Sequence, residues 1–186
     1  MPVRIRGCVP GTSEGKEDGE TVITTLTVLA MVCLLSFLYV LLIPYFASTR
    51  AFMHFLPQEI REAAKNHRDP PAGRRLVGAL LTAAAVAGYL GAWIFLARDG
   101  CRRGYGFWLL FGRFMLFMYG YKLYDILVQD QYLVITKKYF VRFFPETANC
   151  RSWDDRSFNT RNQLIRMALF PVICAFLAWL TWRIGR

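Results

Sequence analysis

The stretch that decides the fold is residues 104–129, GYGFWLLFGRFMLFMYGYKLYDILVQ. A helix rises about 1.5 Å per residue and needs about 20 apolar residues to cross a bilayer core, so this stretch is long enough to span a membrane. Its apolar character is interrupted by three charged residues, Arg113, Lys122 and Asp125. The sequence therefore predicts a transmembrane helix that carries charges inside it.

Three further apolar stretches surround this one. Residues 21–49 and 76–97 contain no Asp, Glu, Lys or Arg, and residues 164–182 contain only Arg166. The predicted fold is therefore an all-α, polytopic membrane protein, a bundle of four transmembrane helices at about 22–46, 76–97, 106–129 and 164–182. Residues 1–20 are polar and are expected to form a flexible tail, which leaves the membrane domain at 21–186.

The composition is strongly basic, with 23 Lys and Arg against 13 Asp and Glu in 186 residues. A nucleic-acid-binding domain would gather these bases on a soluble face, but here they lie in loops beside apolar spans, where anionic lipid is the nearer partner. The five cysteines are widely spaced and form no metal-binding pattern. We therefore expect membrane lipids as partners, no nucleic acid and no cofactor.

The distribution of basic residues also predicts an orientation. The two longer loops, between the first two and the last two spans, together carry thirteen Lys and Arg, whereas the other side carries eight. The positive-inside rule then places both termini outside and the larger loops in the cytoplasm of a multi-pass cell-membrane protein. The residues expected to contact lipid headgroups are Arg74, Arg75, Lys137, Lys138 and Arg142.

The first cytoplasmic loop contains an amphipathic segment. Pro57 suits the first turn of a helix, and residues 58–67 place acids early and bases late, which matches the helix dipole. Apolar residues such as Ile60 supply one side. We expect a short interfacial helix between the first two spans, with a solvated helix as the alternative.

The second span is rich in small residues. Ala84, Gly88 and Ala92 recur at every fourth position and predict a stripe where another backbone can approach closely. This stripe would make the second span the central packing helix. It is also a candidate interface for a homo-dimer or for a partner membrane protein.

The charges in the third span are costly to insert. Its thirteen strongly apolar residues contribute about 5 kcal/mol, whereas three charges at the bilayer centre cost about 9 kcal/mol. The charges must therefore lie near the ends and extend to the interface, or meet partners inside the bundle. In the first case Arg113 reaches outward, and Lys122 reaches inward with Asp125 as its counter-ion three residues along the helix.

The second case is a polar pocket at the inner leaflet. Lys122, Asp125, Asp130 and Tyr121 would line it and handle an ionic substrate or a proton, and these residues are the catalytic candidates. The chain contains none of the common catalytic motifs, such as HExxH, GxSxG or a phosphate loop. His54 and His67 are weak candidates for a metal site, which would also need loop carboxylates to converge, so no metal is predicted.

Three hypotheses for the function follow. The leading one is an accessory or interaction protein whose basic cytoplasmic loops contact anionic lipid or partner proteins. The first alternative is a membrane-embedded enzyme acting on a lipid or another amphiphile through the polar residues at the inner end of the third span. The second is a small oligomeric transporter, which at four spans would need to dimerise.

Three short runs carry a resemblance: residues 56–64 (LPQEIREAA), Tyr124-Asp125 with Asp130, and residues 144–147 (FPET). Through these runs, residues 22–183 resemble a group of small four-span membrane proteins of anaerobic Gram-positive bacteria. The resemblance implies a bacterial cytoplasmic membrane. It implies no activity.

Overall fold

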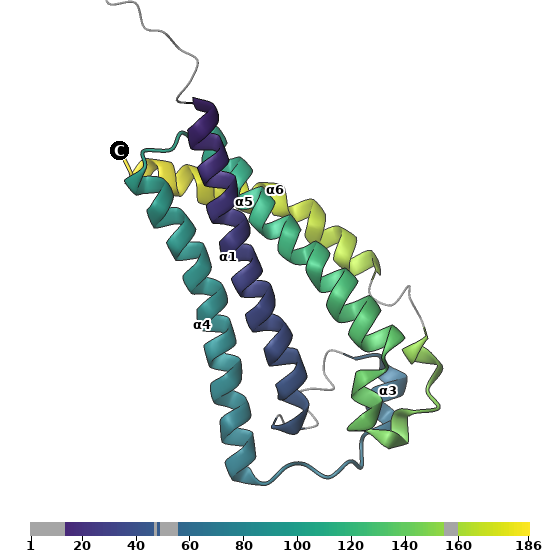
Figure 1. Cartoon of the computed structure of the whole chain (residues 1–186). Coiled ribbons are helices and arrows are strands. Elements are labelled where there is room, and N and C mark those ends of the chain that lie inside the picture. The colour runs from purple at the N-terminus through teal and green to yellow at the C-terminus, as the bar shows by residue number, and fades with distance from the viewer. Residues whose placement is uncertain (1–13, 47, 49–55, 155–159) are drawn as a thin grey trace, which may run out of the picture.

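The computed structural model describes residues 14–46, 48, 56–154 and 160–186, which are helical with connecting turns and contain no strand. The four long helices are α1 (Glu14–Leu42), α4 (Ala72–Arg102), α5 (Phe107–Tyr124) and α6 (Thr160–Ile184). Helix α1 packs against α4, and α5 packs against α6 (Figure 1). The predicted all-helical bundle is confirmed.

Among the described residues, three stretches of helix are long and apolar enough to cross a membrane, namely Gly19–Tyr45, Ala72–Arg102 and Gln163–Ile184. Large apolar side chains on the outer faces of these helices are exposed: Met31 is 66 %, Leu80 61 % and Val172 66 % exposed. Continuous apolar faces of this extent are unusual on a protein surrounded by water. The helices are therefore compatible with a membrane protein.

Helix α1 differs from the predicted first span at its beginning. It starts at Glu14, inside the segment expected to be a flexible tail. Near the end of that segment, the Arg103 guanidinium lies 3.1 Å from Glu20, and the Thr21 hydroxyl donates to the Tyr105 hydroxyl at 2.6 Å. At the other end α1 stops before Pro44, which has no N–H to continue the helix.

A short turn joins the end of α4 to the start of α5. Gly104 has a φ of +68°, a left-handed conformation that favours glycine. The Tyr105 N–H donates to the Gly100 carbonyl at 3.0 Å and closes the turn. This geometry places the start of α5 against the last residues of α4.

The bundle core is centred on α5, not on α4 as the small residues predicted. Phe114 and Phe117 of α5 are 1 % and 0 % exposed, and both contact Trp93 of α4, with ring centroids 5.3 and 5.2 Å apart. Helix α5 packs against both α1 and α6. Its large aromatic side chains fill the core, whereas the small residues of α4 leave most of that helix on the surface.

Helix α5 continues without interruption into a π-helix, η2 (Asp125–Thr136). The hydrogen bonds of a π-helix run from residue i+5 to residue i, and such segments are usually single-turn bulges found at functional sites. Twelve residues is therefore a long π-helix. The rod formed by α5 and η2 ends at Thr136, beyond the predicted end of the third span at about 129.

The two larger loops fold together into one unit, which we call the cap. It consists of α3 (Gln58–Ala63) and the 3-10 turns η3 (Tyr139–Arg142), η4 (Pro145–Thr147) and η5 (Arg151–Trp153). The cap has its own buried core of Ile60, Ala64, Phe140, Phe144, Cys150 and Trp153. Because Ile60 is fully buried there, the apolar side of α3 faces protein.

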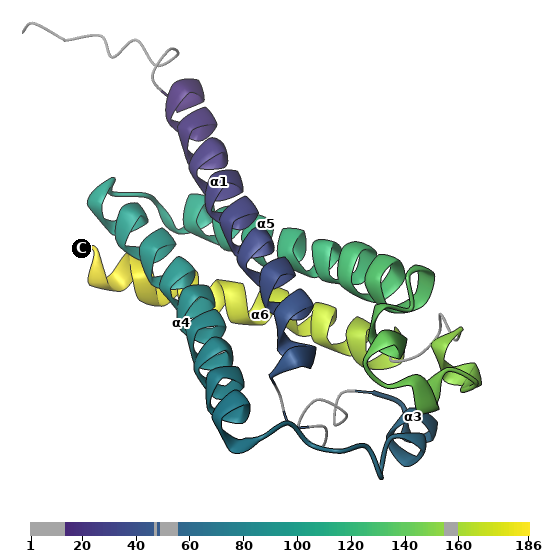
Figure 2. The ribbon, with the colours of Figure 1, turned by 60° about the horizontal axis from the view of Figure 1, so that its bottom comes forward.

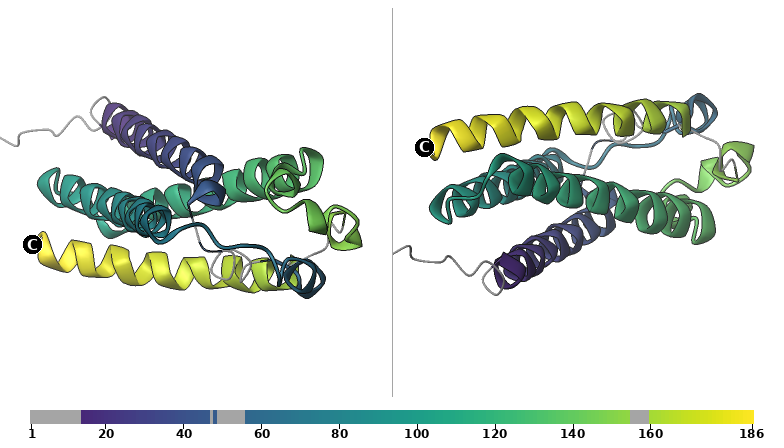
Figure 3. Two further views of the ribbon diagram at one scale, coloured as in Figure 1. Left: turned by 90° about the horizontal axis from the view of Figure 1, so that it is seen from below. Right: turned by 90° about the horizontal axis from the view of Figure 1, so that it is seen from above.

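The cap is fixed to the end of α1. The Tyr139 hydroxyl donates to the Leu41 carbonyl at 2.8 Å, and the rings of Tyr45 and Phe143 meet edge to face at 4.7 Å. Figures 2 and 3 show α3 at one end of the molecule and the end of α6 at the other. We call these ends the cap side and the terminal side.

Candidate functional site

Arg113 lies at the terminal side and is completely buried, with 0 % of its side chain exposed. Its Nη2 donates to Asp99 Oδ2 at 2.7 Å, its Nε to Thr25 Oγ1 at 3.1 Å, and its Nη1 to a backbone carbonyl of α4 at 3.2 Å. All three guanidinium nitrogens therefore have acceptors. The interpretation that Arg113 reaches outward to the interface is wrong, because the bundle supplies its partners.

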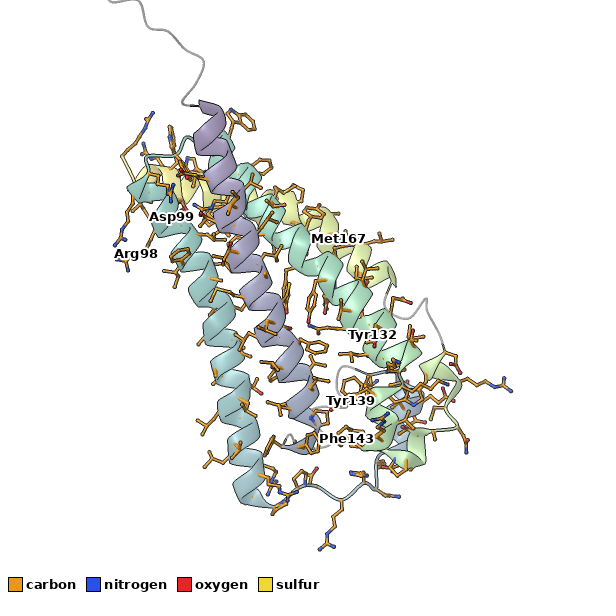
Figure 4. All side chains as sticks on the ribbon, in the orientation of Figure 1. Arg98, Asp99, Tyr132, Tyr139, Phe143 and Met167 are labelled. Atoms are coloured by element: carbon orange, nitrogen blue, oxygen red, sulfur yellow. The ribbon has the colours of Figure 1, made fainter. Side chains whose placement is uncertain are left out.

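Asp99 joins this arginine to a second one. Its other oxygen accepts from Arg103 Nε at 3.1 Å, and Arg103 Nη1 lies 3.1 Å from Glu20. The terminal-side cluster, Glu20, Thr25, Asp99, Arg103 and Arg113, connects α1, α4 and α5 and holds two positive and two negative charges. Figure 4 shows Asp99 near the end of α4, beside the C-terminal end of α6.

A second cluster of charges lies toward the cap side, where α5 passes into η2. Lys122 Nζ is 2.6 Å from Asp125 Oδ2. Gln163 of α6 donates from Nε2 to Asp130 Oδ2 at 2.8 Å. Asp130 is also within electrostatic range of both Asp125 and Lys122. We call these four residues, Lys122, Asp125, Asp130 and Gln163, the cap-side cluster.

The π-helix explains how Asp130 joins this cluster. In an α-helix of 3.6 residues per turn, residues five apart are separated by about 140° around the axis. Hydrogen bonding from i+5 to i brings such residues close to one line, so Asp125 and Asp130 lie on one side of η2. The α-helical spacing assumed from the sequence could not place them together.

A neutral polar group on another side of the same rod faces α1. Tyr121 and Ser36 hydroxyls are 3.0 Å apart, and Gln129 Nε2 donates to Ser36 Oγ at 2.6 Å. The hydroxyl oxygen of Tyr124 is buried without a hydrogen bond of acceptable geometry in the described part of the chain. Of the four catalytic candidates, Lys122, Asp125 and Asp130 are thus together, while Tyr121 is bound to α1.

The sequence analysis did not single out several members of these networks, among them Ser36, Gln163 and Asp99. Ser36 and Gln163 are single polar residues near or within apolar stretches, and Asp99 lies in the turn region after the second span. A polar residue inside a span is a functional candidate by default, so Ser36 could have been singled out. The sequence positions of Ser36, Gln163 and Asp99 do not show which helix each residue contacts.

Two acidic residues of the cap, Glu59 and Glu146, are exposed but have partners within the cap or its connectors. Glu59 accepts hydrogen bonds from the Arg151 and Ser152 N–H groups at 3.2 and 2.9 Å and from the Ser152 hydroxyl. These bonds, above all those from Ser152, hold the pKa of Glu59 below its ordinary value. His67 Nδ1 lies 2.7 Å from Glu146.

The proposed headgroup-binding residues lie around the cap-side end of the molecule. Arg74, Arg75, Lys137 and Arg142 are exposed. Lys137 Nζ lies 5.5 Å from the centre of the Tyr132 ring, an amphipathic pairing common at membrane interfaces. Lys138 differs, since its ammonium is 2.9 Å from Asp154. Four of the five candidates thus present their charge outward.

The weak metal candidates do not meet in the described part of the chain. His67 is engaged by Glu146, and His54 lies outside the described residues. Among the residues that the structure describes, no three His, Cys, Asp or Glu side chains form a group able to hold a metal ion.

The packing candidates on α4 divide between two environments. A Cβ added to Gly88 would lie 2.5 Å from Leu35 Cδ2, so α1 approaches α4 closely there. Ala92 is 8 % exposed. Ala84 is exposed. The stripe therefore meets α1 at Gly88, is buried in the core at Ala92 and is exposed at Ala84.

A small cavity of about 170 Å³ lies at the terminal side. It is bounded by the end of α4, the turn to α5 and the end of α6, and Cys101 and Trp182 are among its lining residues. The Cys101 thiol donates to the Thr181 carbonyl at 3.3 Å. The cavity does not include any of the catalytic candidates.

Comparisons of the chain with protein-family models, with curated proteins and with solved structures found no match.

Proposed function

We propose that this chain is a four-span accessory protein of a bacterial cytoplasmic membrane, whose cap contacts anionic lipid headgroups and partner proteins from the cytoplasmic side. In this proposal α1, α4, α6 and the rod of α5 and η2 cross the bilayer. The cap, including α3, lies at the interface. Both termini are then outside.

The fourth span is supported by the partners of Arg113. An isolated helix with this sequence would not insert, because its charges cost more than its apolar residues contribute. Here Arg113 is neutralised by Asp99 and Lys122 by Asp125. With α5 packed against α1 and α6, the remaining penalty is small enough for α5 to lie in the bilayer.

The docking function rests on one observation, the excess of exposed bases over exposed acids in the cap and its connectors. The acids Glu59, Glu146 and Asp154 are exposed, but each is bound to another group of the cap or its connectors, and Glu62 is exposed on α3. The bases Arg75, Lys137 and Arg142 are exposed, and none of the ion pairs described in the cap includes them. The outward surface is therefore positive and suits an anionic lipid surface, where each base contributes about 1 kcal/mol.

Lipid retention tests this proposal. The protein would be purified in mild detergent and the bound phosphatidylglycerol measured by native mass spectrometry. Replacing Arg75, Lys137 and Arg142 by Gln should weaken retention by about 100-fold, since about 3 kcal/mol is removed. Replacing Arg98, Arg102 and Arg183, which are exposed at the terminal side, is the matched control. Equal loss in both variants would contradict a docking surface on the cap.

The orientation is tested separately by reporter fusions in a bacterial membrane. Alkaline phosphatase, which is active only outside the cytoplasm, should be active when fused after Arg186 and inactive when inserted next to Asp69. The reverse result would place the cap outside and remove the contact with the anionic cytoplasmic leaflet.

The cap-side cluster supports a second candidate, an enzyme acting on an amphiphile. Lys122, Asp125 and Asp130 gather on a π-helix, and two carboxylates beside an ammonium can exchange protons with a substrate. Native mass spectra would then show a stoichiometric small molecule that is lost in Asp130→Asn and kept in the cap variant. A bare protein, or one bound only to phosphatidylglycerol, would favour the accessory role.

A further inference from the structure

We propose that α6 is a hinged helix. Its cap-side half, residues 160–170, can swing about Pro171 away from the rod of α5 and η2, and the Tyr119 hydroxyl is the latch that holds it in place. This inference goes beyond the docking function. It depends on α5 and α6 and on none of the exposed bases of the cap, so the two proposals can fail independently.

The first step is an interruption in the backbone hydrogen bonds of α6. Pro171 lies inside this helix and has no N–H. The carbonyl of Met167, four residues earlier, therefore lacks the donor that an uninterrupted α-helix would supply. Sharp bends in helices occur at positions of this kind. Pro171 is therefore the point about which the two halves of α6 can move.

The second step is the group that replaces the missing donor. The Tyr119 hydroxyl of α5 donates to the Met167 carbonyl at 2.8 Å (Figure 4), and the Tyr119 ring meets Phe170 edge to face at 5.4 Å. In membrane-spanning helices, neighbouring helices often supply the partner of a carbonyl freed by proline. The hydroxyl is the part of this contact that depends on Pro171, because without the proline the carbonyl would be bonded within its own helix.

The third step is the difference between the two halves of α6. After Pro171, Cys174 and Ala178 are fully buried in the bundle core. Before it, none of the side chains of residues 163–170 is buried, and Leu164 is largely exposed. The later half is therefore anchored by packing, whereas the cap-side half makes few buried contacts. Segments with few buried contacts open at a low cost in free energy.

The fourth step is what the movement changes. Gln163, near the start of α6, donates to Asp130 of η2 at 2.8 Å, which is a second polar contact between the cap-side half and the rod. Residues 154–159 join this end of α6 to η5 of the cap. A swing about Pro171 would carry Gln163 away from Asp130 and would move the chain that leaves the cap. The hinge thus couples the position of α6 to that of the cap.

A distance between two spin labels tests the inference. Ketone-containing amino acids that carry the labels would replace Leu127 of η2 and Leu164 of α6, both exposed, and pulsed electron resonance would measure their distance in lipid nanodiscs. Tyr119→Phe keeps the ring and removes only the latch hydroxyl. This variant should add a population with a longer distance and raise the ratio of open to closed molecules about tenfold, because a buried carbonyl loses its hydrogen bond.

The proline provides the decisive control. In Pro171→Ala the N–H of residue 171 can bond the Met167 carbonyl, so that Tyr119→Phe should no longer lengthen the distance. Tyr132→Phe, which removes a hydroxyl from an exposed position on the same rod, should leave the distance as it is in the wild type. If Tyr119→Phe alone does not fold, the double variant Tyr119→Phe with Pro171→Ala should fold and show the closed distance.

A second label pair reports on the anchored half. It replaces Trp108 at the start of α5 and Ile184 at the end of α6, which are both exposed, and its distance should be the same in every variant. The proposal is wrong if Tyr119→Phe leaves the first distance unchanged, lengthens it equally with and without Pro171, or lengthens both distances. A double variant that does not fold would also overturn it, because the hydroxyl would then hold α6 independently of the proline.

Discussion

At the terminal side two arginines meet two carboxylates, whereas at the cap side one lysine meets two aspartates. The terminal-side groups come from different helices, so that breaking them separates α1, α4 and α5. The ion pair at the cap side joins residues three apart on one rod. Balanced charge between helices is typical of a structural connection. The cap-side cluster instead holds one ammonium and two carboxylates on a single rod.

The largest expected effect is at the terminal side. Asp99→Ala leaves the fully buried Arg113 without its counter-ion and should destabilise the protein by about 3–5 kcal/mol. Unfolding by denaturant in mild detergent measures this. Glu20→Ala, at an exposed acid of the same network, should cost less than about 1 kcal/mol.

The double variant Asp99→Leu with Arg113→Met sharpens the interpretation. Replacing a buried ion pair by apolar residues of similar size is often neutral or stabilising. The double variant should therefore be more stable than Asp99→Ala alone. If the double variant is as unstable as Asp99→Ala, the Asp99–Arg113 pair has a role besides connecting the three helices. The terminal-side cluster would then not be a purely structural connection.

The cap is expected to respond as a separate unit. Ile60→Ala removes a fully buried side chain from the cap core and should cost about 3 kcal/mol. Hydrogen exchange should become faster in residues 139–153 and remain unchanged in α4. The neighbouring Arg61→Ala, at an exposed position, should leave the stability and the hydrogen-exchange rates of the cap unchanged. Faster exchange throughout the bundle would show that the two ends are one cooperative unit.

The sequence predicted the features that depend on local chemistry. The apolar stretches predicted the four long helices, and residues 58–67 predicted the short helix α3 within them. The partners of Arg113 could not be predicted in the same way, because Asp99 and Thr25 come from two other helices. Hydropathy shows that a charge must be neutralised and does not show by which residue.

The sequence also did not predict which face of α4 is buried. Gly88 and Ala84 share a predicted stripe, yet Gly88 contacts Leu35 and Ala84 is exposed. Which face packs is decided by the neighbouring helices. The π-helix could not be predicted either, because the sequence analysis assumed α-helical spacing for the residues of η2. Asp130 was named as a candidate, but its place beside Asp125 depends on a backbone that the pattern does not reveal.

At the cap side, breaking the ion pair should have an intermediate effect. Lys122→Met leaves Asp125 without its partner in a half-buried position and should destabilise the protein by about 2 kcal/mol. Asp125→Leu alone should do the same. Lys137→Met, at an exposed lysine, is the matched control. Equilibrium unfolding in detergent measures all three.

Removing both partners distinguishes a structural pair from a site. Lys122→Met together with Asp125→Leu should restore much of the stability. A double variant less stable than either single one would mean that the pair has further partners in the bundle.

The smallest effect is expected at Glu59, an exposed acid whose partners are backbone and hydroxyl groups of η5. Because the folded state holds its pKa below the ordinary value, its contribution is complete above the pKa of an unfolded Glu. That contribution is lost as the pH falls through the lower, folded pKa. Exchange of the Arg151 and Ser152 amides, corrected for its intrinsic pH dependence, should therefore become faster in acid.

Glu59→Gln should remove this acid dependence, because an amide does not titrate, whereas Glu62→Gln on the exposed side of α3 should keep it. If Glu59→Gln leaves the acid dependence unchanged, another carboxylate of the cap controls the contact between α3 and η5.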